Sequence, residues 1–212
     1  MRVLAAGTKA MRCLGMKENW RERLQHYGIT PAEVAACGVL SLGSGAAVGL
    51  HAGGVAAAYS GVLAFGMLII IITDSRRMLI PDVLSLPLIP IGLLAALSVL
   101  PGPSLGILAD HAAAASFAAA ALYTVRWAYF KLRGVIGLGL GDIKLAAAAG
   151  SWVGLDLLPM TLLFASCAAL AATLFRSRFS PQARVSASSA VPFGSFIAAA
   201  ILASWTLLVV SK

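Results

Sequence analysis

Three aspartates in an otherwise apolar chain are the first candidates for chemistry. Asp74 follows a long apolar run, and Asp82 follows Ile80-Pro81. Asp142 ends the alternating segment Gly139-Leu140-Gly141. Because glycine has no side chain, the backbone can bend at this segment and another chain can approach Asp142 closely. An extended substrate lying along it would find backbone groups with which to pair.

Two carboxylates brought together from separate helices can hydrolyse a peptide bond. The ionised carboxylate takes a proton from water, and the protonated one donates a hydrogen bond to the scissile carbonyl. Like charges held close favour this unequal sharing of protons, and the two groups titrate as a unit. Either aspartate could be the base. A helix N-terminus favours negative charge, so Asp142 should ionise more readily than Asp74, which lies near a helix C-terminus.

Another interpretation of the same residues stays open on spacing alone. An aspartate at a helix end commonly caps the helix or pairs with a basic side chain. The available partners are close in the sequence: Arg76, Arg77 and Lys144. Asp110 stands beside His111, but adjacent residues do not face each other on a helix. A structural or interfacial role is therefore expected for Asp110, in preference to a proton relay.

The composition indicates a polytopic membrane protein. Of 212 residues, 60% are hydrophobic and 11% are charged, and the mean hydropathy is +0.92. A soluble domain needs a more polar surface, whereas lipid covers most of a membrane protein. The net charge of +8 is better explained by basic residues at cytoplasmic helix ends than by nucleic-acid binding. The three cysteines form no CxxC pair, and no zinc-ligand spacing is present, so no metal is expected.

The apolar segments predict an all-α bundle of about seven transmembrane helices. We expect residues 1–30 to form a cytoplasmic or interfacial N-terminal segment and residues 31–212 to form one membrane-embedded domain, which would be a peptidase domain if the two aspartates act as a pair. Trp20, Leu24 and Tyr27 suit a short helix on the membrane surface, with a frayed terminus as the alternative. Residues 177–190 are expected to form a mobile cytoplasmic loop. The predicted spans are 32–51, 54–73, 83–100, 105–128, 140–156, 158–175 and 191–210.

Two further features concern how the helices begin and pack. Thr30-Pro31-Ala32-Glu33 combines an N-cap threonine, a proline at the first helical position and a capping-box glutamate, so a helix is expected to start there. The first and fourth spans are rich in small residues, which let membrane helices approach closely. We therefore expect these two spans to lie inside the bundle.

The loops predict the orientation. Basic residues collect in the N-terminal segment and after the second, fourth and sixth spans, whereas the alternate loops carry none. An odd number of spans with the N-terminus inside and the C-terminus outside fits this distribution. Asp74, Asp82 and Asp142 then all lie at the cytoplasmic face of the membrane.

The motifs around these aspartates resemble the signature of type IV prepilin peptidases, which belong to the GxGD group of membrane aspartyl proteases. That signature has an aspartate followed by Ile/Leu-Pro-Asp/Asn, then Gly-x-Gly-Asp-x-Lys-Leu, and later Pro-Phe-Gly-Pro-Phe. Residues 54–210 carry the resemblance. The matching residues are Asp74, Ile80-Pro81-Asp82, Gly139-Leu140-Gly141-Asp142-Ile143-Lys144-Leu145 and Pro192-Phe193-Gly194-Ser195-Phe196.

The resemblance implies that Asp74 and Asp142 are the catalytic aspartates of an inner-membrane enzyme. Its substrates would be prepilins or pseudopilins, cut at the cytoplasmic face after the glycine that ends a short basic leader. Asp82 matches a position that is Asp or Asn in the family, and an amide cannot transfer protons as a carboxylate does, so Asp82 is expected to hold its loop. The expected supporting residues are Pro81, Asp82, Gly139, Gly141, Lys144, Pro192, Phe193 and Gly194.

The chain departs from the family pattern in two ways. Ser195 stands where the family often has proline, a change expected to be mild. Larger members carry a cytoplasmic domain with two zinc-binding CxxC pairs that is linked to N-methylation, whereas this chain has no CxxC. It resembles the compact members that lack this domain. The peptidase activity would need no cofactor, and S-adenosylmethionine only if methylation is retained.

Three alternatives remain. A non-catalytic assembly subunit of a pilus or secretion system would keep the fold, but one that had lost activity would be expected to have lost an aspartate. A small transporter would have charged groups near the middle of its spans, where this chain has few. A peptidase of the same group acting on another membrane substrate differs only in its partner.

Overall fold

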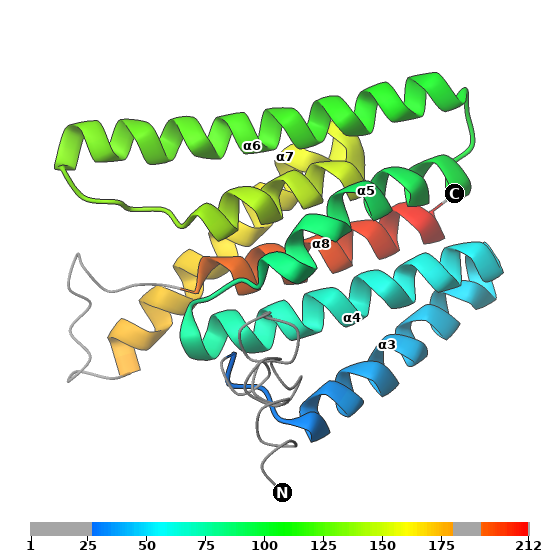
Figure 1. Ribbon diagram of the computed structural model, residues 1–212, viewed down its shortest axis with the longest axis horizontal. Helices are drawn as coiled ribbons and strands as arrows, with labels where there is room; N and C mark the ends of the chain where they lie inside the picture. The colour runs from blue at the N-terminus through cyan, green and yellow to red at the C-terminus, as the bar shows by residue number, and fades with distance from the viewer. Residues whose placement is uncertain (1–26, 180–191, 212) are drawn as a thin grey trace, which may run out of the picture.

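The computed structural model describes residues 27–179 and 192–211, which form six helices and no strands (Figure 1). Each is long and apolar enough to cross a membrane. The all-α prediction is confirmed, and the predicted count of about seven is close. The predicted surface helix near Trp20 and most of the loop 177–190 lie outside the described residues. The helices are α3 (Pro31–Ala52), α4 (Gly54–Arg77), α5 (Asp82–Val99), α6 (Ser104–Arg133), α7 (Leu140–Phe179) and α8 (Phe193–Val210).

The predicted start of the first helix is confirmed in atomic detail. The Glu33 backbone N–H donates to Thr30 Oγ1 at 3.3 Å, and the Thr30 backbone N–H donates to Glu33 Oε2 at 2.8 Å. This reciprocal capping satisfies two backbone donors that α3 would otherwise leave without a partner. Pro31 occupies the first helical position, where its missing N–H costs nothing.

Helix α7 doubles back on itself at Gly154. This glycine has φ 72° and ψ 178°, a conformation that side chains strongly disfavour. In a straight helix Asp142 and Leu170 would lie about 42 Å apart. Both line one pocket, so the segments before and after Gly154 run in opposite directions, as Figure 1 shows. These two arms correspond to the spans predicted at 140–156 and 158–175.

The core lies where α4, α5, α7 and α8 meet. Trp152 of α7 and Trp205 of α8 are fully buried and stack edge to face, with ring centroids 5.0 Å apart. Their indole N–H groups donate to the Leu88 carbonyl at 2.8 Å and to Ser60 Oγ at 2.9 Å. An indole N–H in an apolar interior needs such a partner, so the two tryptophans tie α7 to α5 and α8 to α4.

The prediction that the first and fourth spans lie inside the bundle is wrong. Helix α3 packs chiefly against α4, and α6 chiefly against α7, so both lie at the outer edges of the bundle (Figure 1). Their small residues do permit close approach, but on one side only. A Cβ atom at Gly45 would lie 2.7 Å from the Ala57 carbonyl oxygen, and one at Gly150 would lie 2.4 Å from the Ala114 backbone. Small residues therefore indicate that a helix packs closely against one neighbour, not that other helices surround it.

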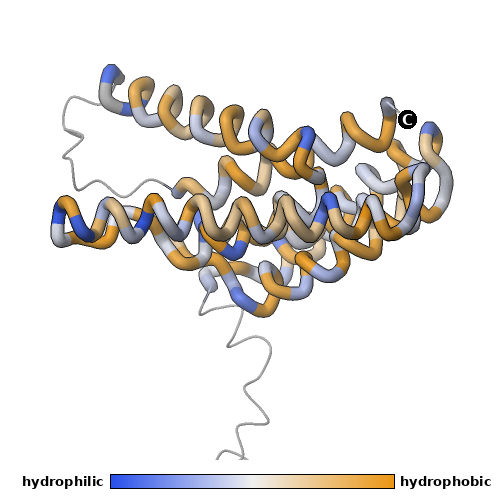
Figure 2. Tube along the Cα trace, turned by 90° about the horizontal axis from the view of Figure 1, so that it is seen from above, coloured by the Kyte–Doolittle hydropathy of each residue, from blue (hydrophilic) through white to orange (hydrophobic). Residues whose placement is uncertain are grey.

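The hydrophilic residues of the bundle lie mostly at the helix ends. In Figure 2 the hydrophilic positions gather mainly toward the ends of the apolar segments. The C-terminal end of α4 and the N-terminal ends of α5, α7 and α8 meet at one end of the bundle (Figure 1). Asp74, Asp82 and Asp142 are all at this end, and together they line one pocket.

Candidate active site

Asp74 lies in the last turn of α4, where its side chain is buried with 4% exposed. Its carbonyl accepts a hydrogen bond from the Met78 N–H at 2.9 Å, which closes the helix. Met78 has φ 52°, and it is the one non-glycine residue with a positive φ in residues 27–179 and 192–211. Such a left-handed residue costs backbone energy. It turns the chain sharply beside Asp74, toward the Ile80-Pro81 segment.

Asp142 is the third residue of α7, and Gly139 is the residue before that helix begins. The Asp142 carboxylate lies against Gly139, since a Cβ atom at Gly139 would lie 3.2 Å from Asp142 Oδ2. A Cβ atom at Gly141 would lie 3.0 Å from the Ile80 Cβ atom, so glycine permits that close packing. The spacing of the glycines and the aspartate thus has a local structural reason.

The loop before Asp142 is held from the side by α6. The Arg126 guanidinium donates a hydrogen bond to the Leu138 carbonyl. A Cβ atom at Gly137 would lie 2.6 Å from the Tyr129 ring, so the glycine lies flat against that aromatic side chain. These contacts fix the loop that precedes α7 and Asp142.

The two carboxylates meet at Gly194. A Cβ atom built on Gly194 would lie 3.1 Å from Asp74 Oδ2 and 3.2 Å from Asp142 Oδ1. The two oxygens are therefore no farther apart than these two distances together. Since a carboxylate oxygen and a water oxygen lie about 2.7 Å apart in a hydrogen bond, this upper limit leaves room for no more than about one water on the line between the two oxygens.

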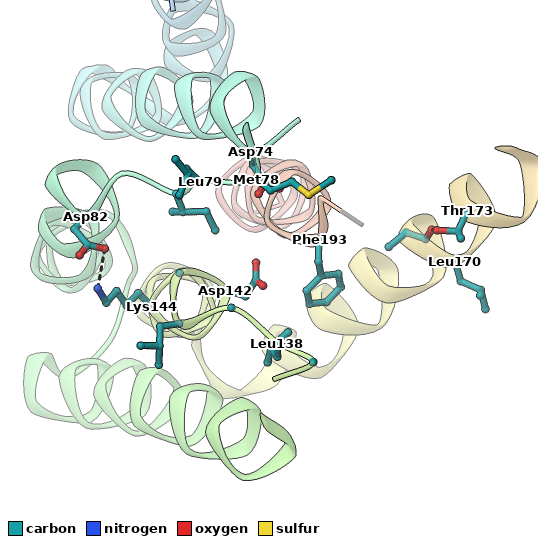
Figure 3. A pocket seen from close by; sticks show the side chains of 16 residues that line it. Asp74, Met78, Leu79, Asp82, Leu138, Asp142, Lys144, Leu170, Thr173 and Phe193 are labelled. Atoms are coloured by element: carbon teal, nitrogen blue, oxygen red, sulfur yellow. Dashed lines mark hydrogen bonds and ion pairs between the residues drawn. The ribbon is translucent and has the colours of Figure 1, made fainter. Parts of the chain in front are cut away.

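A pocket of about 970 Å³ opens onto this pair (Figure 3). Asp74 and Asp142 point toward each other across it, and Phe193 lies beside them. One wall is the loop at residues 137–141, another is the turn at residues 78–80, and the third comes from the returning arm of α7. That arm contributes Ala169, Leu170 and Thr173.

Neither Lys144 nor Arg76 pairs with the two central carboxylates. Lys144 Nζ lies 2.7 Å from Asp82 Oδ1, a contact drawn in Figure 3, and Arg76 pairs with Glu33 on α3. The Asp82–Lys144 ion pair joins the start of α5 to the start of α7. This geometry agrees with the expectation that Asp82 holds its loop.

The other predicted supporting residues lie near the pair in different ways. Gly139, Gly141 and Phe193 line the pocket, and Gly194 is buried between the two carboxylates. Pro81 and Pro192 do not line it; each is the residue that precedes a helix, α5 and α8 respectively.

Asp110 and His111 lie away from this pocket, at the bend of α7. Asp110 Oδ2 accepts a hydrogen bond from the Leu155 N–H at 3.1 Å, and His111 Nδ1 lies 3.0 Å from the Ser151 carbonyl oxygen. Both contacts hold the chain around Gly154. The structural role expected for Asp110 agrees with this arrangement.

Sequence reasoning missed two features of the site. Ser195 contacts Asp74 directly, although its only signal was a serine in place of the family's proline. Leu170 and Thr173 reach the pocket because α7 folds back, and nothing in their own sequence indicates this. Among the described residues no group of three His, Cys, Asp or Glu side chains could hold a metal ion, and the expectation of no cofactor stays a prediction.

The fold and the pocket define a multi-pass membrane protein with two facing carboxylates at one end of its helix bundle. The model of the type IV leader peptidase family matches residues 61–174. A prepilin leader peptidase/N-methyltransferase of Pseudomonas aeruginosa is 33% identical over 152 residues, which cover 69% of this chain and 47% of that protein. The namesake in Klebsiella pneumoniae is 43% identical over 103 residues, covering 49% of this chain and 43% of that protein.

A third relative of the same name, from Dickeya chrysanthemi, is 36% identical over 138 residues, covering 65% of this chain and 46% of that protein. This chain belongs to the type IV leader peptidase family. It spans less than half the length of these relatives. No solved structure matches it. Its apolar helices and its bacterial relatives indicate a multi-pass protein of the inner membrane.

Proposed function

We propose that this chain is an aspartyl endopeptidase that removes the short basic leader from type IV prepilins or pseudopilins, cutting after the leader glycine. The observation that carries the proposal is that Asp74 and Asp142 line one open pocket, with one oxygen of each carboxylate close to the same point beside Gly194. Membership of the leader peptidase family supports it independently.

The chemistry follows from two carboxylates that share one proton. The ionised carboxylate takes a proton from a water held between the pair, and the water oxygen attacks the scissile carbonyl carbon. The protonated carboxyl group gives its proton to the carbonyl oxygen, which yields a tetrahedral diol. Collapse of the diol breaks the C–N bond: one diol hydroxyl returns its proton to the carboxylate that had acted as the acid, and the proton first taken from water passes from the other carboxyl group to the leaving amine. The carboxylates end with one proton between them, ready for another cycle.

The pocket suits a substrate that changes from basic to apolar along its length. Asp74, Asp82 and Asp142 line it. Carboxylates in its lining favour basic residues of a leader. Leu138, Leu170 and Phe193 line it too, and they offer apolar contacts to a hydrophobic segment that follows the cut.

The proposed orientation has the pocket at the cytoplasmic face. Basic residues gather at the same end of the bundle as the pocket, in the last turns of α4, α6 and α7. The connections at the opposite end, around Gly53 and residues 100–103, carry no Lys or Arg. In membrane proteins the loops that carry an excess of Lys and Arg are the cytoplasmic ones.

Co-expression with a candidate prepilin tests this function. The substrate should carry a basic leader, a glycine and an apolar segment, and mass spectrometry of the product gives both the cut site and any added methyl group. Cleavage after the glycine supports the proposal, and an unmethylated product supports a peptidase without methyl transfer. An uncut substrate beside a correctly inserted chain favours the non-catalytic assembly subunit.

A further inference from the structure

Ser195 makes the closest polar contacts to Asp74. Its backbone N–H donates to Asp74 Oδ2 at 2.7 Å, and its hydroxyl lies 3.1 Å from the same oxygen. Ser195 is the third residue of α8, so its N–H is one of the donors that a helix leaves without an internal acceptor. Asp74 of α4 is the acceptor that satisfies it.

The two contacts hold one carboxylate oxygen and leave the other available. Asp74 Oδ1 accepts no hydrogen bond from the part of the chain that the structure describes. It is also not a buried atom, since the Ser85 hydroxyl is the one buried and unpaired side-chain group in that part. Oδ1 therefore reaches the pocket, whereas Oδ2 is fixed against the start of α8.

The Ser195 hydroxyl has one proton and two acceptors. It lies 2.7 Å from the Pro192 carbonyl oxygen as well as 3.1 Å from Asp74 Oδ2. The hydroxyl can donate to the carboxylate when Asp74 is ionised, and to the carbonyl when a proton on Asp74 replaces that bond. Ser195 thus has a partner in both protonation states through which a proton-transferring aspartate passes.

We propose that Ser195 is a positioning residue, which holds Asp74 Oδ2 through its N–H and hydroxyl so that the carboxylate faces Asp142. This inference rests on the proposed peptidase function. Proline, which the family often has here, supplies neither donor. Relatives with proline must hold their aspartate by other contacts, so the test compares variants within this chain.

Three substitutions separate the contributions. Ser195→Thr keeps both donors, Ser195→Ala removes the hydroxyl, and Ser195→Pro removes both at a first-turn position that tolerates proline. The matched control is Ser41→Ala on α3, because Ser41 is also buried and donates to the carbonyl three residues before it. The assay is cleavage of a synthetic peptide with a basic leader, a glycine and an apolar segment, by purified chain in lipid vesicles.

We expect Ser195→Ala to lower kcat about threefold to tenfold with KM unchanged, the effect of losing one hydrogen bond. Ser195→Pro should lower kcat further, and Ser195→Thr should match the wild type, as should Ser41→Ala. Equal kcat for the alanine, proline and wild-type chains would overturn the proposal, as would a fall in kcat that Thr does not prevent. A wild-type chain that cuts nothing would defeat the proposed peptidase function itself, whereas cleavage by Asp74→Asn would defeat the catalytic role of Asp74 on which this inference rests.

Discussion

Asp74 and Asp142 reach the same point from opposite helix ends, one from the last turn of α4 and the other from the first turn of α7. Each has a local reason for its position: a left-handed turn follows Asp74 at Met78, and the Asp142 carboxylate lies against Gly139, the residue before α7. A third helix, α8, closes the space between them with Gly194, whose missing side chain leaves room for both carboxylates.

Gly194→Ala should disable the site without unfolding the protein. The added methyl group would lie 2.5 Å from Ile80 Cδ1 and little more than 3 Å from a carboxylate oxygen of both aspartates, so the pair must separate. We expect cleavage to fall by about 100-fold, as for small misplacements of catalytic groups. Gly43→Ala is the control, because a Cβ atom there meets nothing within 4 Å. Wild-type cleavage by Gly194→Ala would mean that the two carboxylates need not approach so closely.

Gly154→Ala should destabilise the bundle by bending α7 away from its return path. Its backbone conformation suits glycine almost alone, and the new methyl group would lie 2.5 Å from Asp110 Oδ2. We expect a loss of about 3 kcal/mol or more in the free energy of unfolding in detergent. Gly134→Ala has a similar φ of 70° but a ψ of 4° and open space, so it should cost only about 1–2 kcal/mol. Equal losses would show that neither the extended ψ of Gly154 nor its contact with Asp110 adds to the cost.

The ion pair between Asp82 and Lys144 should matter little to stability. The Asp82 side chain is 58% exposed, and exposed pairs contribute about 0–1 kcal/mol. Asp82→Asn retains an acceptor for Lys144, so cleavage should stay within about fivefold of the wild type. Lys144→Gln, alone and combined with Asp82→Asn, completes a double-mutant cycle of cleavage rates. A loss of cleavage in Asp82→Asn as large as in Asp74→Asn would assign Asp82 to catalysis.

The pH dependence of kcat/KM should be bell-shaped. At low pH both central carboxyl groups hold protons and no base remains, and at high pH both are ionised and no acid remains. Cleavage should therefore fall on both sides of one optimum, and Asp82→Asn should keep the same profile. A rate that rises with pH and then stays level would contradict an acid–base pair.

Much of the fold follows from the sequence because apolar length determines a membrane helix. The predicted spans coincide with the observed helices to within a few residues, apart from longer C-terminal ends of α4, α6 and α7. Even the return of α7 was predicted as two spans, since Gly154 and Asp156 interrupt the apolar run. The positions of α3 and α6 at the edges of the bundle were not predicted. Small residues permit close contact with a neighbouring helix, but they do not specify how many sides of their own helix are covered.

Within the site, local motifs were readable and long-range contacts were not. Gly139 lies against Asp142 within one turn, so its role could be inferred from spacing, whereas the packing of Gly141 against Ile80 could not. The bonds from Ser195 to Asp74 join helices that are distant in the sequence, and only the packing of α8 against α4 brings them together. The same holds for Leu170, which reaches the pocket through the bend at Gly154.

The most direct test of the central claim is leader removal by the chain with Asp74→Asn, Asp142→Asn or Asp82→Asn, each at equal membrane levels and beside the wild type. The paired-carboxylate mechanism predicts that the first two lose cleavage by about 1000-fold or more, because neither retains both an acid and a base. Asp82→Asn should still cut. Substantial cleavage by either Asp74→Asn or Asp142→Asn would contradict the catalytic pair.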